Sequence, residues 1–515
     1  MTESRVDPAE ARLEKSPKAV VRQSGITSVV ALVGVLSGLV LDLAWGSVFG
    51  IGYESDAFTL ALRLPLAITA IAMVVANQVL VPTFGAWLTT MGERERARAM
   101  SAVMLACLGL SIVLALIFSF FAYPLMAAMA PGFADEPGKL DLAASMTRIL
   151  AWYVPCVIVA EVLRCWLNAK LVIGFPAAMT LVLNVVSVAV ILLGPRSNWV
   201  VPAAYVAGSL VQVLAMAIAA FVKGWRPAAP AFGHPEVRRT LRLFSRPTVG
   251  AAMNPIVRIV EVFIASALPQ GSTTLLHYGN RLASAVGGTI IFRSIMVTVL
   301  PRISRAFTRG DTPAFRSMTR LGLRLMLFLA VPMTILGVTL APGLTHAVFG
   351  LVPKFKHEQI VTLGTLMALY SLSFAGSGLQ RALLAPFYAM RDTRTPLRNT
   401  VYGIVANVGL LFILDVAMGD GPRAIYLFPI AYSASQYVNV GHAWWLMRAV
   451  PGSTIGCCGG SRSFTQDRRF ASTCRPVIAK PVGQACIPLR TVFESTSSWA
   501  KSPRPGAHRN WLLPT

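Results

Sequence analysis

Charged residues are scarce in this chain of 515 residues. They make up 13% of it, and the acidic ones are the rarer kind, with 22 Asp and Glu against 46 Lys and Arg. Soluble domains carry about 25% charged residues. Hydrophobic residues make up 55% of the chain, and its mean hydropathy is +0.63. So little charge over so long a chain excludes an ordinary soluble protein and predicts one that is embedded in a membrane.

The chain also lacks the motifs of soluble enzymes. It has no P-loop, no HExxH and no GxSxG sequence. The loops between its apolar stretches are too short to hold an ATPase domain. Its seven cysteines show no paired CxxC spacing, which argues against a zinc site. We therefore expect no enzyme, no metal and no cofactor, and any transport must draw on an ion gradient, the membrane potential or the substrate's own gradient.

Long apolar stretches dominate the sequence. A helix needs about 20 residues to cross a hydrocarbon core of about 30 Å. Twelve stretches are long enough, at residues 25–50, 57–86, 100–128, 142–168, 171–194, 199–222, 245–268, 274–300, 321–349, 358–388, 397–418 and 424–447. The stretches are continuously apolar, without the alternation of a membrane barrel, so we expect an all-α polytopic membrane protein with about twelve transmembrane helices.

The net charge of +24 comes from basic residues clustered in alternate loops. This is the positive-inside pattern, and with an even number of helices it puts both termini in the cytoplasm. A nucleic-acid partner is therefore not expected. The predicted parts are a cytoplasmic tail at 1–24, a first lobe at 25–223, a basic cytoplasmic linker at 224–241, a second lobe at 242–448, and a basic, disordered cytoplasmic tail at 449–515.

One helix-pair pattern occurs twice. Its first copy contains Arg63 and ends at Pro82, and its second contains Arg281 and ends at Pro301, at the same points of the two copies. Six helices in each half, both starting inside, make the two repeats parallel in topology. Duplicated polytopic proteins are most often transporters, because two similar halves can rock about a shared central site.

The repeat places one arginine of each half inside the membrane. Neither Arg63 nor Arg281 has an acidic residue three or four positions away. Guanidinium groups grip phosphates and diphosphates through paired hydrogen bonds, so both are candidate substrate ligands. The alternative is an interhelical pair with Asp42, Asp56 or Glu261. His277 and Asn280, within a turn of Arg281, are candidates to bind a sugar or phosphate, although such residues more often bond another helix.

Four further charges are candidates for gating or ion pairing. Arg258 and Glu261 are three residues apart on one helix face, where they predict a local ion pair. Asp42 is a partner for Arg63 only through a tertiary contact. Asp56 begins a predicted helix, where its own helix dipole favours a carboxylate.

Several motifs, taken together, resemble the MurJ/MviN-type lipid II flippase family. They are Gly50-Ile51-Gly52, Ser55-Asp56-Ala57-Phe58, Leu62-Arg63-Leu64-Pro65, Val81-Pro82, Ala130-Pro131-Gly132-Phe133, Leu167-Asn168-Ala169, Phe175-Pro176, Tyr278-Gly279-Asn280-Arg281-Leu282 and Leu300-Pro301-Arg302-Ile303-Ser304. The resemblance covers about residues 25–450. It implies the MOP exporter fold, a V-shaped bundle of two six-helix lobes.

The same resemblance implies a role in the bacterial inner membrane. The chain would move an undecaprenyl-diphosphate-linked peptidoglycan precursor, lipid II, from the inner to the outer leaflet by alternating access. Arg281 and Arg63 would grip the diphosphate, and Asp42 and Asp56 would position them or act as gates. The expected partners are this anionic lipid-linked glycan, the bilayer and proteins of cell-wall synthesis.

The chain departs from the family in two places. It has Val35 and Leu41 where the family has helix 1 arginines, and Thr69 or Ala70 where the family has another. It also has a polar tail in place of two further helices. Two alternatives follow, a non-transporting paralogue or scaffold and a flippase for another lipid-linked glycan. A multidrug exporter of the MATE type would want an acidic cavity, which Arg63 and Arg281 argue against.

Overall fold

A computed structural model describes residues 17–448, except 173, 196, 288, 391, 393, 419, 420 and 422. The predicted tail at 449–515, and residues 1–16 of the tail at 1–24, lie outside the described residues. Helix α2 (Pro17–Phe49) begins within that N-terminal segment. The described residues form helices and connecting loops and contain no strand. The all-α prediction is confirmed.

Each apolar stretch of the first half corresponds to one helix or to two consecutive helices. After α2 they are α3 (Tyr53–Thr90), α4 (Glu93–Phe120), α5 (Ala122–Met129), the 3₁₀ helix η1 (Pro131–Asp135), α6 (Lys139–Leu150), α7 (Tyr153–Ala169), α8 (Gly174–Leu193) and α9 (Val200–Val222).

The second half follows the same plan after a short helix in the linker. Its elements are α10 (Pro235–Leu243), α11 (Ser245–Ala265), α12 (Ser272–Val286), α13 (Thr289–Thr308), α14 (Thr312–Thr339), α15 (Ala341–Phe349), α16 (His357–Ser371), α17 (Ser373–Ala389), α18 (Arg394–Met418), η2 (Ala424–Tyr426) and α19 (Leu427–Arg448).

Within the described residues, nine helical segments are long and apolar enough to cross a membrane. They are α3, α4, α6 with α7, α8, α9, α10 with α11, α14, α16 with α17, and most of α18. The remaining predicted spans fall on α2, on α12 with α13, and on α19. The protein is thus a multi-pass membrane protein, and the count of twelve spans stays a prediction.

The helix lengths repeat between the halves. Helices α4 and α14 each have 28 residues, and each is followed after a single residue by a short helix, of 8 residues in α5 and 9 in α15. Pro124 and Pro342 lie just after these two breaks, where a missing N–H favours interruption of the helix. Helices α7 and α17 each have 17 residues. The two halves therefore share an order of helices as well as sequence motifs.

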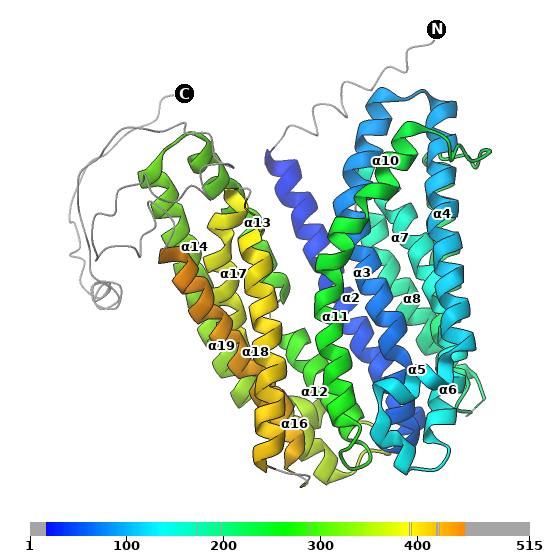
Figure 1. Ribbon diagram of the computed structural model, residues 1–515, viewed down its shortest axis with the longest axis vertical. Helices are drawn as coiled ribbons and strands as arrows, with labels where there is room; N and C mark the ends of the chain where they lie inside the picture. The colour runs from blue at the N-terminus through cyan, green and yellow to red at the C-terminus, as the bar shows by residue number, and fades with distance from the viewer. Residues whose placement is uncertain are drawn as a thin grey trace, which may run out of the picture.

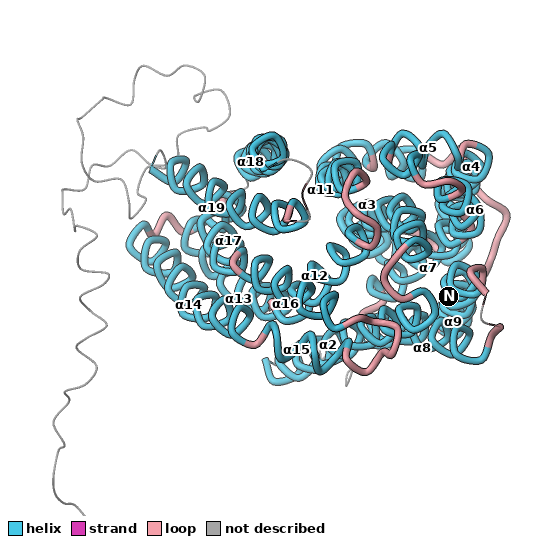
Figure 2. Tube along the Cα trace, turned by 90° about the horizontal axis from the view of Figure 1, so that it is seen from below, coloured by secondary structure: helices cyan, strands magenta, loops and turns pink. Residues whose placement is uncertain are grey.

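The two groups of helices approach each other at one end of the molecule and diverge at the other (Figure 1). Helices α2 and α3 of the first half contact α12 of the second, and α11 packs along α3. Seen from the end where the halves meet, α12 lies between the two groups (Figure 2). The contacts between the halves therefore lie mainly along α11 and α12.

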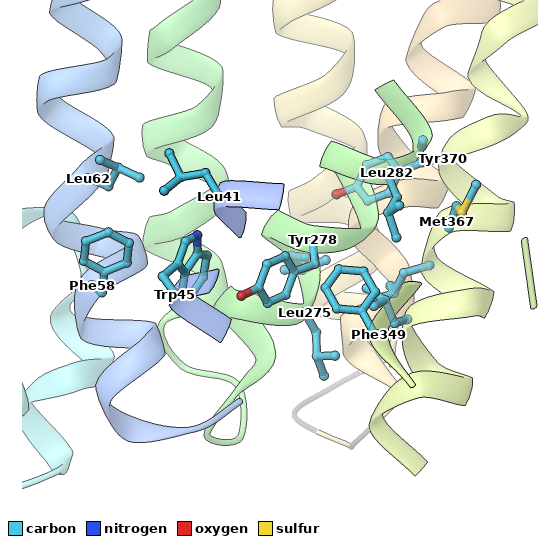
Figure 3. Close-up of a cluster of buried hydrophobic side chains, with 14 of the residues drawn as sticks. Leu41, Trp45, Phe58, Leu62, Leu275, Tyr278, Leu282, Phe349, Met367 and Tyr370 are labelled. Atoms are coloured by element: carbon cyan, nitrogen blue, oxygen red, sulfur yellow. The ribbon is translucent and has the colours of Figure 1, made fainter. Parts of the chain in front are cut away.

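An aromatic cluster fills the junction between the halves (Figure 3). Trp45 of α2 stacks on Tyr278 of α12 with ring centroids 4.8 Å apart. Phe58 of α3 lies 5.2 Å from Trp45, and Phe349 of α15 lies 4.9 Å from Tyr278. Such ring pairs contribute about 0.5–1.5 kcal/mol beyond the area they bury. The cluster holds α2 and α12 at a close distance, beside the polar residues described next.

Candidate functional site

Arg281 and Asp42 form an ion pair between the two halves. Arg281 Nε of α12 donates to Asp42 Oδ2 of α2 over 3.0 Å. Trp45 Nε1 donates to the other carboxylate oxygen over 3.3 Å, and the Tyr278 hydroxyl donates to the Asp42 carbonyl over 3.1 Å. Asp42 is buried, so its charge depends on these partners. The pair of Arg281 with Asp42 is one of the interhelical pairs that the sequence left open, and among the described residues Asp42 pairs with Arg281 rather than with Arg63.

The guanidinium of Arg281 lies flat against α2. A Cβ atom added at Gly38 would come 2.3 Å from Arg281 Nη2, so only glycine leaves room for the side chain in this position. The Arg281 side chain is 45% exposed although one of its edges is bound to Asp42. Asn184 of α8 lies close by and donates to Ser37 Oγ over 2.8 Å. Arg281 therefore keeps an accessible edge that can bind an anion.

A second cluster of polar residues lies where α3, α11, α12 and α16 meet. It surrounds a small pocket of about 30 Å³, lined among others by Arg63, Arg258, Glu261, Thr273, His277, Asn280 and Tyr370. Arg258 Nη1 donates to Glu261 Oε2 over 2.7 Å, and Arg258 Nη2 donates to Asn280 Oδ1 over 3.3 Å. The local ion pair predicted for Arg258 and Glu261 is present.

Arg63 has a buried Nε without a hydrogen-bond partner among the described residues. Its nearest carboxylate in the pocket, Glu261, is already bound to Arg258. Two arginines against one glutamate give the pocket net positive charge. His277 and Asn280 line the same pocket as Arg63, whereas Arg281 follows Asn280 on α12 and pairs with Asp42. An unpaired buried donor is costly and is a position where an anionic ligand would be stabilised.

Asp56 lies at the end of the molecule where the halves meet. Its Oδ2 accepts from the Gly271 N–H over 2.7 Å, and its Oδ1 accepts from the Thr274 N–H over 3.0 Å and from the Thr274 hydroxyl over 2.8 Å. Asp56 lies in the first turn of its own helix, as predicted, but its bonds to α12 were not predicted. It belongs to α3 but caps α12, the helix that carries His277, Asn280 and Arg281.

The ammonium group of Lys139 neutralises the negative charge of Asp56. Lys139 was not among the residues that the sequence singled out. Its Nζ lies 3.4 Å from Asp56 Oδ2 and 2.7 Å from Glu136 Oε1. The ammonium group also lies 4.0 Å from the centroid of the Phe133 ring. Lys139 is almost fully buried, at 1% exposure. The sequence places Lys139 in a loop before an apolar stretch. No feature of that segment indicates that its partner lies 83 residues away.

Further bonds join the halves at the same end. The Gly132 N–H donates to Ser266 Oγ over 3.2 Å, and a Cβ at Gly132 would lie 2.5 Å from the Ser266 carbonyl oxygen. Gln359 donates to the Ile51 carbonyl, and Lys354 to the Val48 carbonyl. These hydrogen bonds between residues 17–222 and residues 245–448 thus lie at this end and at Asp42, next to the aromatic cluster.

Comparison with known proteins decides the family. A family model described as lipid II flippase MurJ matches residues 46–456. The chain belongs to the MurJ family. The probable lipid II flippase MurJ of Bdellovibrio bacteriovorus is 25% identical over 421 residues, which are 78% of this chain and 78% of that protein. The lipid II flippase MurJ of Burkholderia cenocepacia is 25% identical over 398 residues, covering 75% of each chain.

Solved structures support the fold of the MurJ family. A lipid II flippase MurJ in an inward closed conformation superposes with a TM-score of 0.70 at 18% identity, covering 82% of this chain and 88% of that one. An inward-facing MATE multidrug transporter of the MOP superfamily superposes with a TM-score of 0.61 at 15% identity, covering 82% and 98%. The predicted MOP architecture is confirmed.

The cap on α12 can be tested by replacing Asp56 with asparagine. The amide removes the negative charge and one acceptor oxygen, so one N–H of α12 loses its partner. A hydrogen bond to a charged group contributes about 1.5–3 kcal/mol, so the amides of Gly271 and Thr274 should exchange with solvent about tenfold faster or more in Asp56→Asn. Hydrogen exchange followed by mass spectrometry measures this.

The matched control is Asp141→Asn, an exposed carboxylate in the first turn of α6. It should leave exchange at the start of α12 unchanged. Equal exchange rates in Asp56→Asn and the unmodified chain would contradict the assigned role of Asp56.

Proposed function

We propose that this chain translocates lipid II across the bacterial inner membrane by alternating access. Membership in the MurJ family supports the substrate. The positive-inside pattern supports a cytoplasmic position for both termini and for the end where the halves diverge. The segments 25–223 and 242–448 would be the two units that rock against each other. Contact with proteins of cell-wall synthesis is part of the same proposal.

The observation that carries the proposal is a pair of arginines, one from each half, close to one pocket. Arg63 lines the pocket beside His277 and Asn280, and Arg281 follows Asn280 on α12 and keeps an exposed edge. Lipid-linked precursors present a diphosphate, and guanidinium groups bind it through parallel charged hydrogen bonds. Arg281 would use its exposed edge first. Full engagement would replace the Asp42 carboxylate as its partner, so that binding weakens an ion pair between the halves.

The pocket around Arg63 is too small for a diphosphate as it stands. Its volume of about 30 Å³ corresponds to one water molecule. Occupation therefore requires α11 and α12 to separate from α3. In this respect the structure would be a resting state, closed at the end where the halves meet. Asp42 holds Arg281, and Glu261 holds Arg258 beside Arg63.

Asp56 would act as a gate at the end where the halves meet, which is the end facing away from the cytoplasm in this proposal. For the halves to part at this end, the bonds from Asp56 to Gly271 and Thr274 must break, and Lys139 would keep the released carboxylate charge-balanced. The gate and the substrate ligands are linked because both involve α12. A ligand that moves α12 would thus weaken the gate, which is the coupling that alternating access needs.

The net charge of the pocket distinguishes between the alternative functions. A non-transporting scaffold predicts a junction without net positive charge, and a cation exporter of the MATE type predicts an acidic one. The pocket holds Arg63 and Arg258 against Glu261 alone, which favours an anionic substrate. Another lipid-linked glycan would present the same diphosphate, so the test must use lipid II itself.

The test is complementation of a bacterium depleted of its own lipid II flippase, with matched lipid II translocation in proteoliposomes. The unmodified chain should restore growth. Arg281→Gln should lower translocation about tenfold or more, because a charged hydrogen bond of about 1.5–3 kcal/mol is lost. Arg320→Gln, an exposed arginine of α14, is the control and should behave as the unmodified chain does.

A second variant, Gly38→Ala, keeps every charge but displaces the guanidinium of Arg281. Alanine is favoured over glycine within a helix by about 0.5–1 kcal/mol, so the fold should stay stable while translocation falls. No growth with the unmodified chain, correctly inserted, would refute lipid II as the substrate. Full translocation by Arg281→Gln would refute the proposed site.

A further inference from the structure

Helix α10 has two unlike faces. Val237 and Thr240 are buried, and Val237 belongs to the apolar cluster of the first half that Leu241 also contacts. Arg238, Arg239 and Arg242 are exposed on the other side. The helix has nine residues, too few to cross a membrane. Its pattern is that of an amphipathic helix which lies along a membrane surface.

The position of α10 is fixed by its neighbours. His234 Nε2 donates to Glu95 Oε1 of α4 over 2.8 Å, and His234 Nδ1 accepts from the Glu236 N–H over 3.3 Å, which caps α10. Just before the helix, the Ala231 N–H donates to the Arg98 carbonyl over 3.3 Å. The bonds to Glu95 and Arg98 therefore hold α10, which carries the exposed arginines, against α4.

The arginines line a cavity of about 640 Å³ where α10 turns into α11, together with Leu243 and Ser245. This lies within the range of about 300–1,000 Å³ that is typical of ligand pockets. Arg239 has a carboxylate, Glu236, at 3.6 Å. Arg238 and Arg242 have no acidic partner in the described part of the chain, and they are one helical turn apart, where like charges repel. A bound anion would relieve that repulsion.

The cavity lies at a membrane boundary. Helix α11 alone has 21 residues, enough to cross the hydrocarbon core, so the preceding α10 lies at its surface, at the end where the halves diverge (Figure 1). Phe232, Leu243 and Val249 flank the arginines and are exposed by 49%, 48% and 69%. These side chains suit acyl chains, while the guanidinium groups sit at the depth of lipid phosphates.

We propose that this cavity binds the phosphate head group of an anionic glycerophospholipid from the surrounding leaflet. The exposed apolar residues favour a lipid over a soluble anion. The site is separate from Arg63 and Arg281, and it does not depend on the identity of the transported substrate. Because α10 continues into α11, which carries Arg258 and Glu261, a lipid held here stabilises the position of α11 against the first half.

The experiment uses the full-length chain in phosphatidylcholine liposomes with a tenth of photoactivatable phosphatidylglycerol. Cross-linked peptides are mapped by mass spectrometry. Cross-links should concentrate on residues 232–249, and Arg238→Gln with Arg242→Gln should lower their yield about tenfold, as expected for two arginines near a charged surface. The conservative pair Arg238→Lys with Arg242→Lys should keep most of the yield.

The matched control is Arg320→Gln with Arg324→Gln, two exposed arginines with the same spacing on α14. It should leave the cross-links at 232–249 unchanged. Equal losses in both glutamine pairs would show a general charge effect and overturn the proposal, as would cross-links that concentrate elsewhere. Displacement of the lipid by millimolar inorganic phosphate would also overturn it, because the site would then take a soluble anion. If the variant with Arg238→Gln and Arg242→Gln does not fold, the cross-link map of the unmodified chain and the competition with phosphate still test the proposal.

Discussion

The first turn of a helix exposes N–H groups that have no partner within the helix, and in α12 the other half of the protein supplies the acceptor. Asp56 binds two of these groups, at Gly271 and Thr274, where the helix dipole also favours a negative charge. Gly271 has φ of 90°, a left-handed conformation that glycine adopts readily, and this turn presents its N–H to the carboxylate. The relation between the halves depends on this cap.

The position of α12 in turn fixes the proposed substrate ligands. His277 lies one turn after Thr274, and Asn280 and Arg281 follow on the next turn, so all three move with the capped end. Beyond the cap, Tyr278 and Arg281 both bind Asp42 of α2. Three contacts with the first half therefore hold α12 at successive points along its length: the cap at Asp56, the aromatic cluster at Tyr278 and the ion pair of Arg281 with Asp42. A movement of α12 away from one of these contacts would therefore act on the other two, and this would link the proposed substrate ligands to the proposed gate at Asp56.

Apolar length and periodicity predicted most of the fold. Every predicted span contains a helix, because a long apolar run has few other ways to satisfy its backbone in a bilayer. Five predicted spans are each divided into two helices, and these breaks were not predicted. They lie between α4 and α5, α6 and α7, α12 and α13, α14 and α15, and α16 and α17. Helix α10 was read only as a basic linker, since its apolar face of two or three residues is too short to stand out.

The members of the candidate site were predicted, and so was the local pair of Arg258 with Glu261, but not the pairings between distant residues. Arg63, Arg258, Glu261, His277 and Asn280 share one pocket, as a repeat of charged residues inside the membrane suggested. Asp42 was one of three partners considered for Arg281, and the bonds of Asp56 to α12 were not predicted, because each of these contacts joins residues more than 200 positions apart. Local spacing carries no record of such contacts, and for Lys139 it carried no signal at all.

The central claim is that the halves must part at Asp56 for transport to occur. Ser55 Oγ and Thr274 Oγ1 are 3.0 Å apart across this contact, so Ser55→Cys with Thr274→Cys places two thiols within reach of a disulfide. Lipid II translocation would be measured in proteoliposomes with this double variant, oxidised and then reduced. The account predicts that oxidation stops translocation and that reduction restores it. Undiminished translocation by the fully oxidised protein would contradict it.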